Sequence, residues 1–323
     1  MMAQLHIGKM LSNDTKQIKR KTITDKIVRG VLLSLTILCS LIIIFVTLFI
    51  LIKGLMPFFK EYEINGEKVR VNIISFLFGT TYFKAPATYG IGFVFIDTIY
   101  VTFLALLLAV PVSILSALFI VRIAPKVLSK ILNSIVELLA SIPSVIFGMF
   151  GTAIITKFVK WLSNLFNYQS SGGLSTLASA IILALMIIPT ITMISVTAIS
   201  SIKQDQILGS LALGASKTET NYKVVLLGAK NGIISGIILG TGRALGEATA
   251  ISMVCGNEYS GPTFNLFDKT RTLTTSMLQN IHETSGLDYD IRFSIGLVLI
   301  IIIILTNILL NIVKNKIGKK YAK

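Results

Sequence analysis

Charged residues are scarce in this chain of 323 residues. Asp, Glu, Lys and Arg together make up 14% of it, against roughly 25% in a soluble globular domain. Hydrophobic residues make up 53%, and they occur in blocks of about 20, the number of helical residues that crosses a hydrocarbon core about 30 Å thick. This composition excludes an ordinary soluble enzyme and indicates an integral membrane protein of the all-α class.

Cysteine and histidine are also rare, with two residues of each. Cys39 lies inside an apolar block and Cys255 at the end of one, so they offer neither a disulfide framework nor metal-ligand spacing. His6 and His282 are isolated along the chain, which leaves no zinc site and no catalytic triad. Because the sequence also offers no nucleophile-and-base pair and no cofactor loop, a membrane enzyme is disfavoured and no cofactor is expected.

Six apolar blocks predict six membrane-spanning helices. The blocks cover residues 31–52, 97–121, 134–156, 174–199, 231–254 and 293–313. The first block is too long for a signal-peptide core, so we interpret it as a retained anchor. The other five form a predicted core domain at 97–313. Around it lie an N-terminal segment at 1–30, a loop at 53–96 and a basic tail at 314–323. The aromatic segment 158–168 is predicted to lie at the membrane interface rather than to span it.

The net charge of +15 is concentrated at the chain ends and in the short connections between apolar blocks. Six spans place both ends on one side of the membrane, and that side carries 19 Lys and Arg residues against 10 on the other. Basic residues are enriched in cytoplasmic loops. Both termini are therefore predicted to be cytoplasmic, and the 53–96 loop extracellular. Because the bases form no single face interleaved with aromatics, nucleic acid is not an expected partner.

The predicted helix at 231–254 is rich in glycine and carries two charges. Gly232, Gly236 and Gly240 are four residues apart and form one stripe on which another backbone can pack closely. Arg243 and Glu247 follow Gly240 by three and seven residues, so both charges are expected on the same side of the helix. A charge in the bilayer costs about 2.5–3.5 kcal/mol even on insertion scales and is rarely left facing lipid. The pair is therefore predicted to face the bundle interior or a water-filled path.

Two interpretations of this pair remain open. In the first, Arg243 and Glu247 form an i,i+4 ion pair that neutralises itself and locks helix packing. In the second, which we favour, Arg243 presents a fixed charge to an anionic substrate, because its planar fork binds oxyanions bidentately and never deprotonates. Glu247 would then hold the arginine in place and keep the site from binding the anion too tightly.

The predicted third helix contains polar residues around a proline. Pro143 is expected to kink the helix and to free backbone groups toward a cavity, which makes Ser141 and Ser144 candidate residues of a substrate path. Glu137 lies near the cytoplasmic side, where a position at the interface or at a favourable helix N-terminus explains its charge.

The connection 200–230 is a long polar stretch that joins the fourth and fifth spans. It is either a solvated linker or a short amphipathic helix on the cytoplasmic face. Residues 209–216 superficially resemble a phosphate-binding loop, but Ala215 occupies the position of the essential lysine. The chain is therefore not expected to bind ATP by that route.

Several segments together resemble the permease subunits of ABC importers. Gly214, followed nine residues later by VVLL, is similar to their coupling-loop pattern of E-A-A, three residues, G, nine residues and I-x-L-P. More specifically, ALGASKTETNYKVVLLGAKNGIISGIILGTGRALGEATAISMVCGN (212–257) resembles the phosphate-specific permeases of the PstC type. ELLASIPSVIFGMFG (137–151) and ILALMIIPTITMIS (182–195) are similar to other stretches of that family. Two positions depart from the coupling pattern, since Leu208 and Leu227 stand in place of its glutamate and its closing proline.

The resemblance implies a polytopic type I ABC importer permease with the MetI-like fold, which moves inorganic phosphate across the cytoplasmic membrane. The implied partners are a homologous second permease of the PstA type, two copies of an ATPase of the PstB type and an extracellular phosphate-binding protein of the PstS type. The small residues Ala212, Gly214 and Ala215 would form the surface that docks on the ATPase, which alone hydrolyses ATP. Arg243 would line the path.

Two alternatives stay open. A permease for another oxyanion would share all of these features. An ion-coupled secondary transporter would use Arg243 and Glu247 as a self-contained site, but such folds often show two inverted halves with broken helices in matching positions. The sequence shows no such repeat, and only one predicted helix carries charges deep in its span.

Overall fold

The computed structural model describes the backbone of residues 2–64, 66–83, 88–279 and 281–320. The chain divides into two compact units, Met1–Ile52 and Lys53–Lys323. Within the described residues, six helices are long and apolar enough to cross a membrane: Asp25–Phe59, Gly92–Ile123, Ser144–Leu165, Thr176–Ser200, Lys217–Gly246 and Leu287–Lys316. The predicted all-α class and the number of spans are therefore confirmed, although several helix ends differ from those predicted.

The first unit lies within the single helix α1 (Met2–Phe59), which contains the predicted span 31–52 and extends beyond it in both directions. Apolar side chains are exposed all around residues 31–52 of this helix, as shown by Ile43 and Phe45, which are 66% and 69% exposed. A helix that is apolar on every side and unburied requires another apolar surrounding, here the hydrocarbon of the membrane. His6, predicted to be isolated, lies outside the side chains that the structure describes, as does His282.

The second unit contains the remaining elements. In chain order they are β1 (Tyr62–Ile64), β2 (Glu67–Val69), α2 (Ile73–Phe78), β3 (Tyr82–Phe83), β4 (Thr88–Tyr89), α3 (Gly92–Leu118), α4 (Lys126–Ser141), α5 (Ser144–Phe150), α6 (Thr156–Leu165), α7 (Thr176–Ser200), α8 (Gln204–Ala212), α9 (Lys217–Glu219), α10 (Leu226–Gly246), α11 (Thr249–Ser252), α12 (Leu273–Leu278) and α13 (Leu287–Lys320). Three π-helical turns, η1 (Phe119–Ile123), η2 (Gly151–Ile155) and η3 (Thr220–Val225), extend or join α-helices, and η4 (Ile281–Glu283) is a 3-10 turn. The strands form two antiparallel hairpins, with Tyr62 opposite Val69 and Tyr82 opposite Tyr89.

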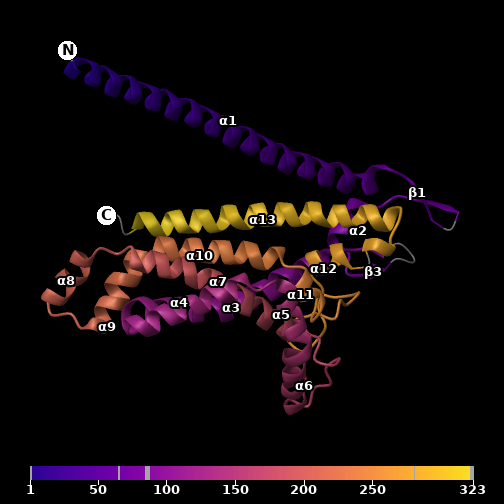
Figure 1. Ribbon diagram of the computed structural model, residues 1–323. Coiled ribbons are helices and arrows are strands. Elements are labelled where there is room, and N and C mark those ends of the chain that lie inside the picture. The colour runs from indigo at the N-terminus through magenta and orange to yellow at the C-terminus, as the bar shows by residue number, and fades with distance from the viewer. Residues whose placement is uncertain (1, 65, 84–87, 280, 321–323) are drawn as a thin grey trace. The chain divides into compact units, whose positions relative to one another are not determined.

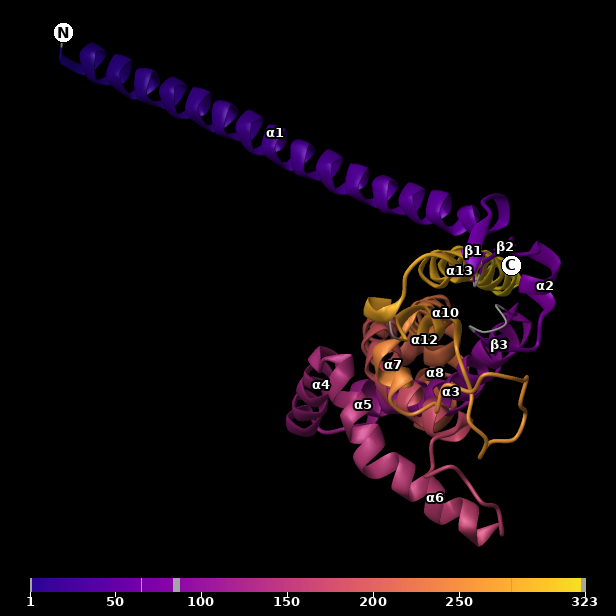
Figure 2. The ribbon, with the colours of Figure 1, turned by 90° about the vertical axis from the view of Figure 1, so that its right-hand side faces the viewer.

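Helix α7 is the most buried span of this unit. It packs against both α3 and α10, and α10 in turn packs against α13. Figures 1 and 2 show these four helices as neighbouring rods. Small and β-branched side chains such as Ala105, Ala109, Ile187 and Ile191 fill the α3–α7 interface. Helix α10 is therefore held between α7 and α13.

The two ends of the second unit differ in structure (Figure 1). One end, which we call the loop end, consists of residues 60–64, 66–83, 88–91, 247–279 and 281–286. Its apolar core joins aromatic residues of the first half of the chain, including Phe76 and Phe93, to Leu273 and Ile291 from the second half. The opposite end, which we call the α8 end, consists of residues 201–225 and carries α8, α9 and η3.

The third span begins and ends later than predicted. Helix α4 stops at Ser141, and Ile142 adopts an extended conformation (φ −66°, ψ 128°) before Pro143. Proline disfavours the α conformation in the residue before it and lacks the N–H that would continue the ladder. The apolar span then runs through α5, η2 and α6 as Ser144–Leu165. Most of the segment 158–168, predicted to be interfacial, belongs to α6 at the end of this candidate span, and Figure 1 shows α6 directed across the direction of α3, α7, α10 and α13.

The fifth span ends earlier than predicted, at Gly246 rather than at 254. Glu247 is extended (φ −76°, ψ 123°) and terminates α10. Its backbone carbonyl accepts a hydrogen bond from the Thr274 hydroxyl at 2.7 Å, and its side chain accepts one from the Ala250 N–H at 3.0 Å. These two bonds satisfy groups that a continuous helix would have paired internally, so the chain can turn here into the short helix α11.

Candidate functional site

Three glycines of α10 set its distance from α7. A Cβ added at Gly232 would lie 2.4 Å from Ala198 Cβ, and one at Gly240 would lie 2.7 Å from Ile191 Cγ1. At Gly236 the nearest atom would be 3.2 Å away. Since all these neighbours belong to α7, the glycine stripe of the sequence is the surface on which α7 and α10 meet.

A second row of glycines on α10 faces open space. No atom lies within 4 Å of a Cβ added at Gly242 or at Gly246. Arg243 sits between these two glycines in the sequence and is half-buried. The last turns of α10 therefore combine one tightly packed side with one side that leaves room next to a charged residue.

Arg243 is held by a neutral partner. Its Nη1 donates a hydrogen bond to Thr190 Oγ1 of α7 at 2.8 Å. In the described part of the chain, no carboxylate oxygen lies within 4.0 Å of its guanidinium nitrogens. Because threonine carries no charge, this hydrogen bond orients the guanidinium without cancelling its positive charge.

Glu247 does not form the predicted i,i+4 ion pair with Arg243. The helix ends one residue before Glu247, so the two side chains no longer share a helical face. The carboxylate instead caps the N–H of Ala250. Thr190, which sequence analysis did not single out, thus has the orienting role that was predicted for Glu247.

An open groove of about 700 Å³ lies beside Arg243. Helices α7, α10 and α13 form it, and its lining residues are Thr190, Ser235, Ile238, Leu239, Gly242, Arg243, Asn307 and Asn311. The polar lining consists of one guanidinium, two hydroxyls and two amides, and these eight described residues include no acid. A groove with one cation and several neutral hydrogen-bonding groups is suited to an anion.

The serines predicted as path residues do not line this groove. Ser141 is exposed at the end of α4, and its hydroxyl donates to the Leu138 carbonyl at 2.7 Å. Ser144 is half-buried at the start of α5. Glu137 accepts a hydrogen bond from the Asn133 amide at 2.7 Å and lines a separate groove of about 570 Å³ between α4 and α7.

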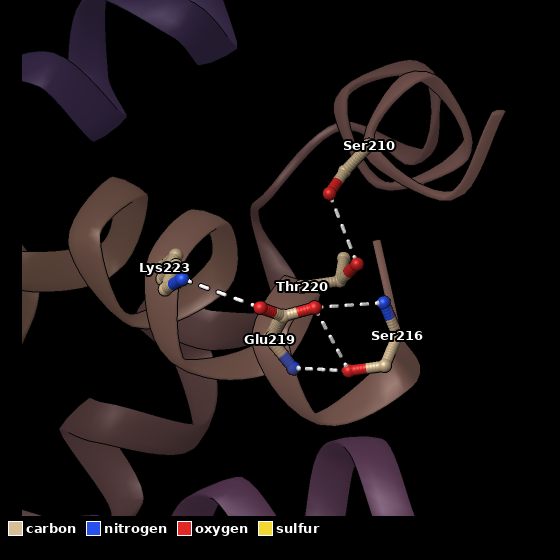
Figure 3. A network of polar contacts seen from close by, with 5 residues as sticks. All are labelled: Ser210, Ser216, Glu219, Thr220 and Lys223. Atoms are coloured by element: carbon tan, nitrogen blue, oxygen red, sulfur yellow. Dashed lines mark hydrogen bonds and ion pairs between the residues drawn. The ribbon is translucent and has the colours of Figure 1, made fainter. Parts of the chain in front are cut away.

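The polar connection 200–230 is ordered as helix, turn and helix rather than as a linker. Figure 3 shows the contacts that hold it. Ser216 and Glu219 form a reciprocal capping box, in which each side chain bonds the other residue's backbone N–H. Lys223 lies 3.3 Å from the Glu219 carboxylate, and the hydroxyls of Ser210 and Thr220 are 3.0 Å apart. The last contact ties α8 to the beginning of the rod that becomes α10.

The tip of this connection carries the three small residues predicted to dock on an ATPase. Gly214 has a positive φ of 86°, which explains why glycine occupies the turn. Ala212 is exposed and Ala215 half-exposed on either side of it. Leu213 between them is 91% exposed, an unusual state for a large apolar side chain and one that fits a docking surface.

The two departures from the coupling pattern are also on the surface. Leu208 is 60% exposed on α8, and Leu227 is 46% exposed at the beginning of α10. Where the pattern has a charged residue and a proline, this chain therefore presents two further apolar side chains.

A buried arginine at the loop end was not anticipated from the sequence. Arg271 is 2% exposed, and its guanidinium carbon lies 4.6 Å from the ring centre of Tyr82 and 5.0 Å from that of Tyr259. It also donates to the Gln279 side chain. Burial lowers the pKa of Arg271 and raises the pKa of Tyr82. These contacts hold the loop end together and lie outside the lining of the Arg243 groove.

Other residues of the groove were missed because each is unremarkable when considered separately. Thr190, Ser235, Asn307 and Asn311 are common polar residues within apolar spans. The signal that could have found two of them is the spacing of Asn307 and Asn311, which are four residues apart and therefore lie on one face of a helix.

The structure is that of a polytopic helical membrane protein, with a charged groove between its spans and an ordered polar loop at one end. The family described as "Binding-protein-dependent transport system inner membrane component" matches residues 109–323, and the chain belongs to this family. It is therefore a multi-pass permease subunit of the ABC importer class.

Curated relatives cover most of the chain. It is 36% identical over 272 residues to the probable ABC transporter permease protein YqgH of Bacillus subtilis (strain 168), covering 81% of this chain and 83% of that protein. It is 33% identical to the phosphate transport system permease protein PstC of Pasteurella multocida (strain Pm70), covering 70% and 75%. It is 31% identical to a probable PstC of Methanocaldococcus jannaschii, covering 90% and 93%. The resemblance to permeases of the PstC type is confirmed.

Solved structures share the fold. A bacterial alginate ABC transporter in complex with alginate pentasaccharide-bound periplasmic protein matches with a TM-score of 0.64 at 17% identity, covering 93% of this chain and 98% of that one. A bacterial ABC transporter involved in the import of alginate matches with a TM-score of 0.60 at 18% identity, covering 91% and 98%. At these identities the likeness establishes the MetI-like permease architecture alone.

Proposed function

We propose that this chain is the permease subunit through which an ATP-driven importer moves inorganic phosphate across the cytoplasmic membrane. The observation that carries the proposal is the state of Arg243. A neutral hydroxyl orients its guanidinium beside an open groove between membrane spans, so its charge is available to an anion. Phosphate is the anion proposed because several relatives are named as phosphate permeases.

An arginine in this setting is stabilised only when something compensates its charge. Leaving a guanidinium uncompensated in the bilayer region is costly, and in the described residues no carboxylate pairs with it. An anionic substrate supplies that compensation transiently, because it can both arrive and leave. A structural ion pair would instead hold the arginine permanently and would leave it no part in transport.

The α8 end is the proposed docking surface for one of two copies of a separate ATPase of the PstB type. The turn at Gly214 displays Leu213 between small residues, a shape that can insert into a groove of a partner. Closure of the ATPase dimer would pull on this surface. The path would then open alternately to one side of the membrane and to the other. The path would be completed by a homologous second permease of the PstA type.

Orientation follows from the distribution of basic residues. With both termini cytoplasmic, the α8 end faces the ATPase in the cytoplasm and the loop end faces outward. A phosphate-binding protein of the PstS type would then deliver its ligand to the loop end.

The test of the proposed function is phosphate uptake by the complete complex reconstituted in proteoliposomes. Arg243→Gln removes the charge but keeps hydrogen-bonding capacity, so uptake should be abolished while the subunits still purify together. Arg243→Lys keeps the charge but loses the bidentate fork, so uptake should fall to an intermediate level. Normal phosphate uptake by Arg243→Gln would make Arg243 a packing residue and refute the proposed path.

The energy source is tested in the same vesicles. Uptake should require ATP on the cytoplasmic side. Uptake that persists without ATP would instead identify an ion-coupled secondary transporter. Competition by sulfate, arsenate and molybdate would show whether another oxyanion is preferred.

The docking surface is tested at the turn itself. Gly214→Val cannot adopt the positive φ without strain and should release the ATPase during purification. Gly214→Asn is the matched control, because asparagine tolerates this conformation. If the ATPase remains bound equally well to both variants, the turn is not the docking element.

A further inference from the structure

Helix α13 brings two amides to the groove that Arg243 lines. Asn307 and Asn311 are four residues apart and lie on one face of the helix. Both line the groove, and neither forms a side-chain hydrogen bond with the residues that the structure describes. Both belong to the span Leu287–Lys316. The groove therefore has a polar wall opposite α10, and its amide groups are available to bond a molecule in the groove.

An amide without a partner is expensive in a membrane. In hydrocarbon it costs several kcal/mol because water is absent. These side chains must therefore meet water, a substrate or another protein chain. Their place in the lining of a groove that also contains Arg243 points to the first two.

The polar groups extend along the groove rather than gathering at one point. Helices α10 and α13 are consecutive spans, so they cross the membrane in opposite directions. Passing from Arg243 to Ser235 on α10 therefore leads toward the same end of the protein as passing from Asn307 to Asn311 on α13. At a rise of about 1.5 Å per residue these steps are about 12 Å and about 6 Å.

We propose that Asn307 and Asn311 are substrate-positioning residues that form the neutral half of the anion path, opposite Arg243. This inference rests on the proposed function. Their amide N–H groups donate to the oxygens of the anion as it passes Arg243. Because amides carry no charge, they stabilise the anion without the tight binding that a second cation would cause, and the anion can leave again.

The amides also define the class of anion that fits. Arginine can only donate hydrogen bonds, whereas an asparagine side chain both donates and accepts. Phosphate and arsenate carry a hydroxyl at neutral pH, whose O–H can donate a hydrogen bond to an asparagine oxygen, whereas sulfate carries none. A site built to hydrogen-bond a substrate hydroxyl discriminates against an analogue that lacks it. The groove therefore favours a hydroxyl-bearing tetrahedral oxyanion.

The experiment uses the complete complex in proteoliposomes with inorganic phosphate and its binding protein. The variants are Asn307→Leu and Asn311→Leu, which keep the size of the side chain but remove its hydrogen bonds. Thr306→Val, on the same helix but outside the lining of the groove, is the matched control. Asn307→Gln keeps the amide and tests for rescue.

We expect each leucine variant to lower the amount of phosphate moved per ATP hydrolysed by about tenfold. Stimulation of ATP hydrolysis by the loaded binding protein should stay near that of the unmodified complex, since the docking surfaces are intact. Asn307→Gln should recover most of the transport, and Thr306→Val should behave as the unmodified protein.

Two results would overturn the inference while leaving the proposed function in place. One is an unchanged ratio of phosphate to ATP in both leucine variants. The other is loss of the second permease from the purified complex, which would show that the amides bond a neighbouring helix rather than the substrate. By contrast, failure of the unmodified complex to transport phosphate would refute the proposed function itself.

Discussion

The packing of α10 on α7 can be tested by adding one methyl group to each of two glycines on the same helix. Gly232 faces α7, and an added Cβ there would lie 2.4 Å from Ala198 Cβ. Gly242 faces the open side, where no atom lies within 4 Å of an added Cβ. Gly232→Ala and Gly242→Ala are therefore the same chemical change in two different surroundings.

The expected effect follows from two opposing terms. Replacing glycine by alanine within a helix gains up to about 1 kcal/mol from helix propensity at either position. Carbon atoms make their best contact at about 3.5–4.0 Å, so α7 and α10 must separate by about 1 Å to accept the new methyl group at 232. Overpacking of this kind costs about 1–3 kcal/mol. Because the propensity gain cancels in the comparison, Gly232→Ala should be less stable than Gly242→Ala by about 1–3 kcal/mol, or roughly 2–12 °C in melting temperature.

The buried thiol of Cys255 provides the assay. It is fully buried, so a maleimide dye reacts with it only when the fold opens, provided that Cys39 has been replaced by serine. The double variant Gly232→Ala with Ala198→Gly removes the clashing methyl group and should recover most of the loss. Equal melting temperatures for the two single variants, or no recovery in the double variant, would refute the close contact between α7 and α10.

Three further predictions concern the ends of the second unit. Arg271→Lys loses the planar stacking on two tyrosine rings and should lower stability by about 1–2 kcal/mol in the same thermal assay, whereas unchanged stability would mean that the rings do not hold the guanidinium. Burial raises the pKa of Cys255 from 9.0 to about 11, so the fold favours the neutral thiol. The free energy of unfolding should therefore be unaffected by this thiol below pH 9 and should fall between pH 9 and 11. Cys255→Ser should flatten that decline. Ser216→Ala removes the N-cap of α9 and should lower the stability of this turn by about 1 kcal/mol. Residues 211–219 should then be cleaved faster by a protease than the same residues in the control variant Ser201→Ala.

The number of spans could be predicted because each span is a long apolar run, but helix ends depend on local backbone chemistry that the runs obscure. The apolar residues continue on both sides of Pro143, so the break at Ile142 shifted the third span by about ten residues. The fifth helix was extended too far for the same reason, since the residues after Gly246 are still small and apolar. The pairing of Glu247 with Thr274, 27 residues further along the chain, ends that helix and has no local signal.

The candidate site shows the same division between local and distant information. The glycine stripe and the charge of Arg243 could be read directly from one helix. The partner of Arg243 is 53 residues away on α7, and the amides of α13 are more than 60 residues away, so only the packing of three helices brings them together. The buried stack around Arg271 likewise joins segments near residues 82 and 259.

The separation of Arg243 from Glu247 bears on how energy would reach the groove. If the two residues formed a pair, protonation of Glu247 could itself control the charge of Arg243, and the site could be driven by ions alone. In the structure the carboxylate caps α11 instead, so control of Arg243 must come from elsewhere. The span that carries Arg243 extends from Lys217 to Gly246 and includes the π-helical segment η3, and it is about 45 Å long. It begins at the capped turn next to Leu213, which is the surface proposed to contact the ATPase. A continuous helix transmits displacement along its length, so movement of that turn by the ATPase would move the guanidinium relative to Thr190 on α7. The same helix thus contains both the proposed docking end and the proposed anion site.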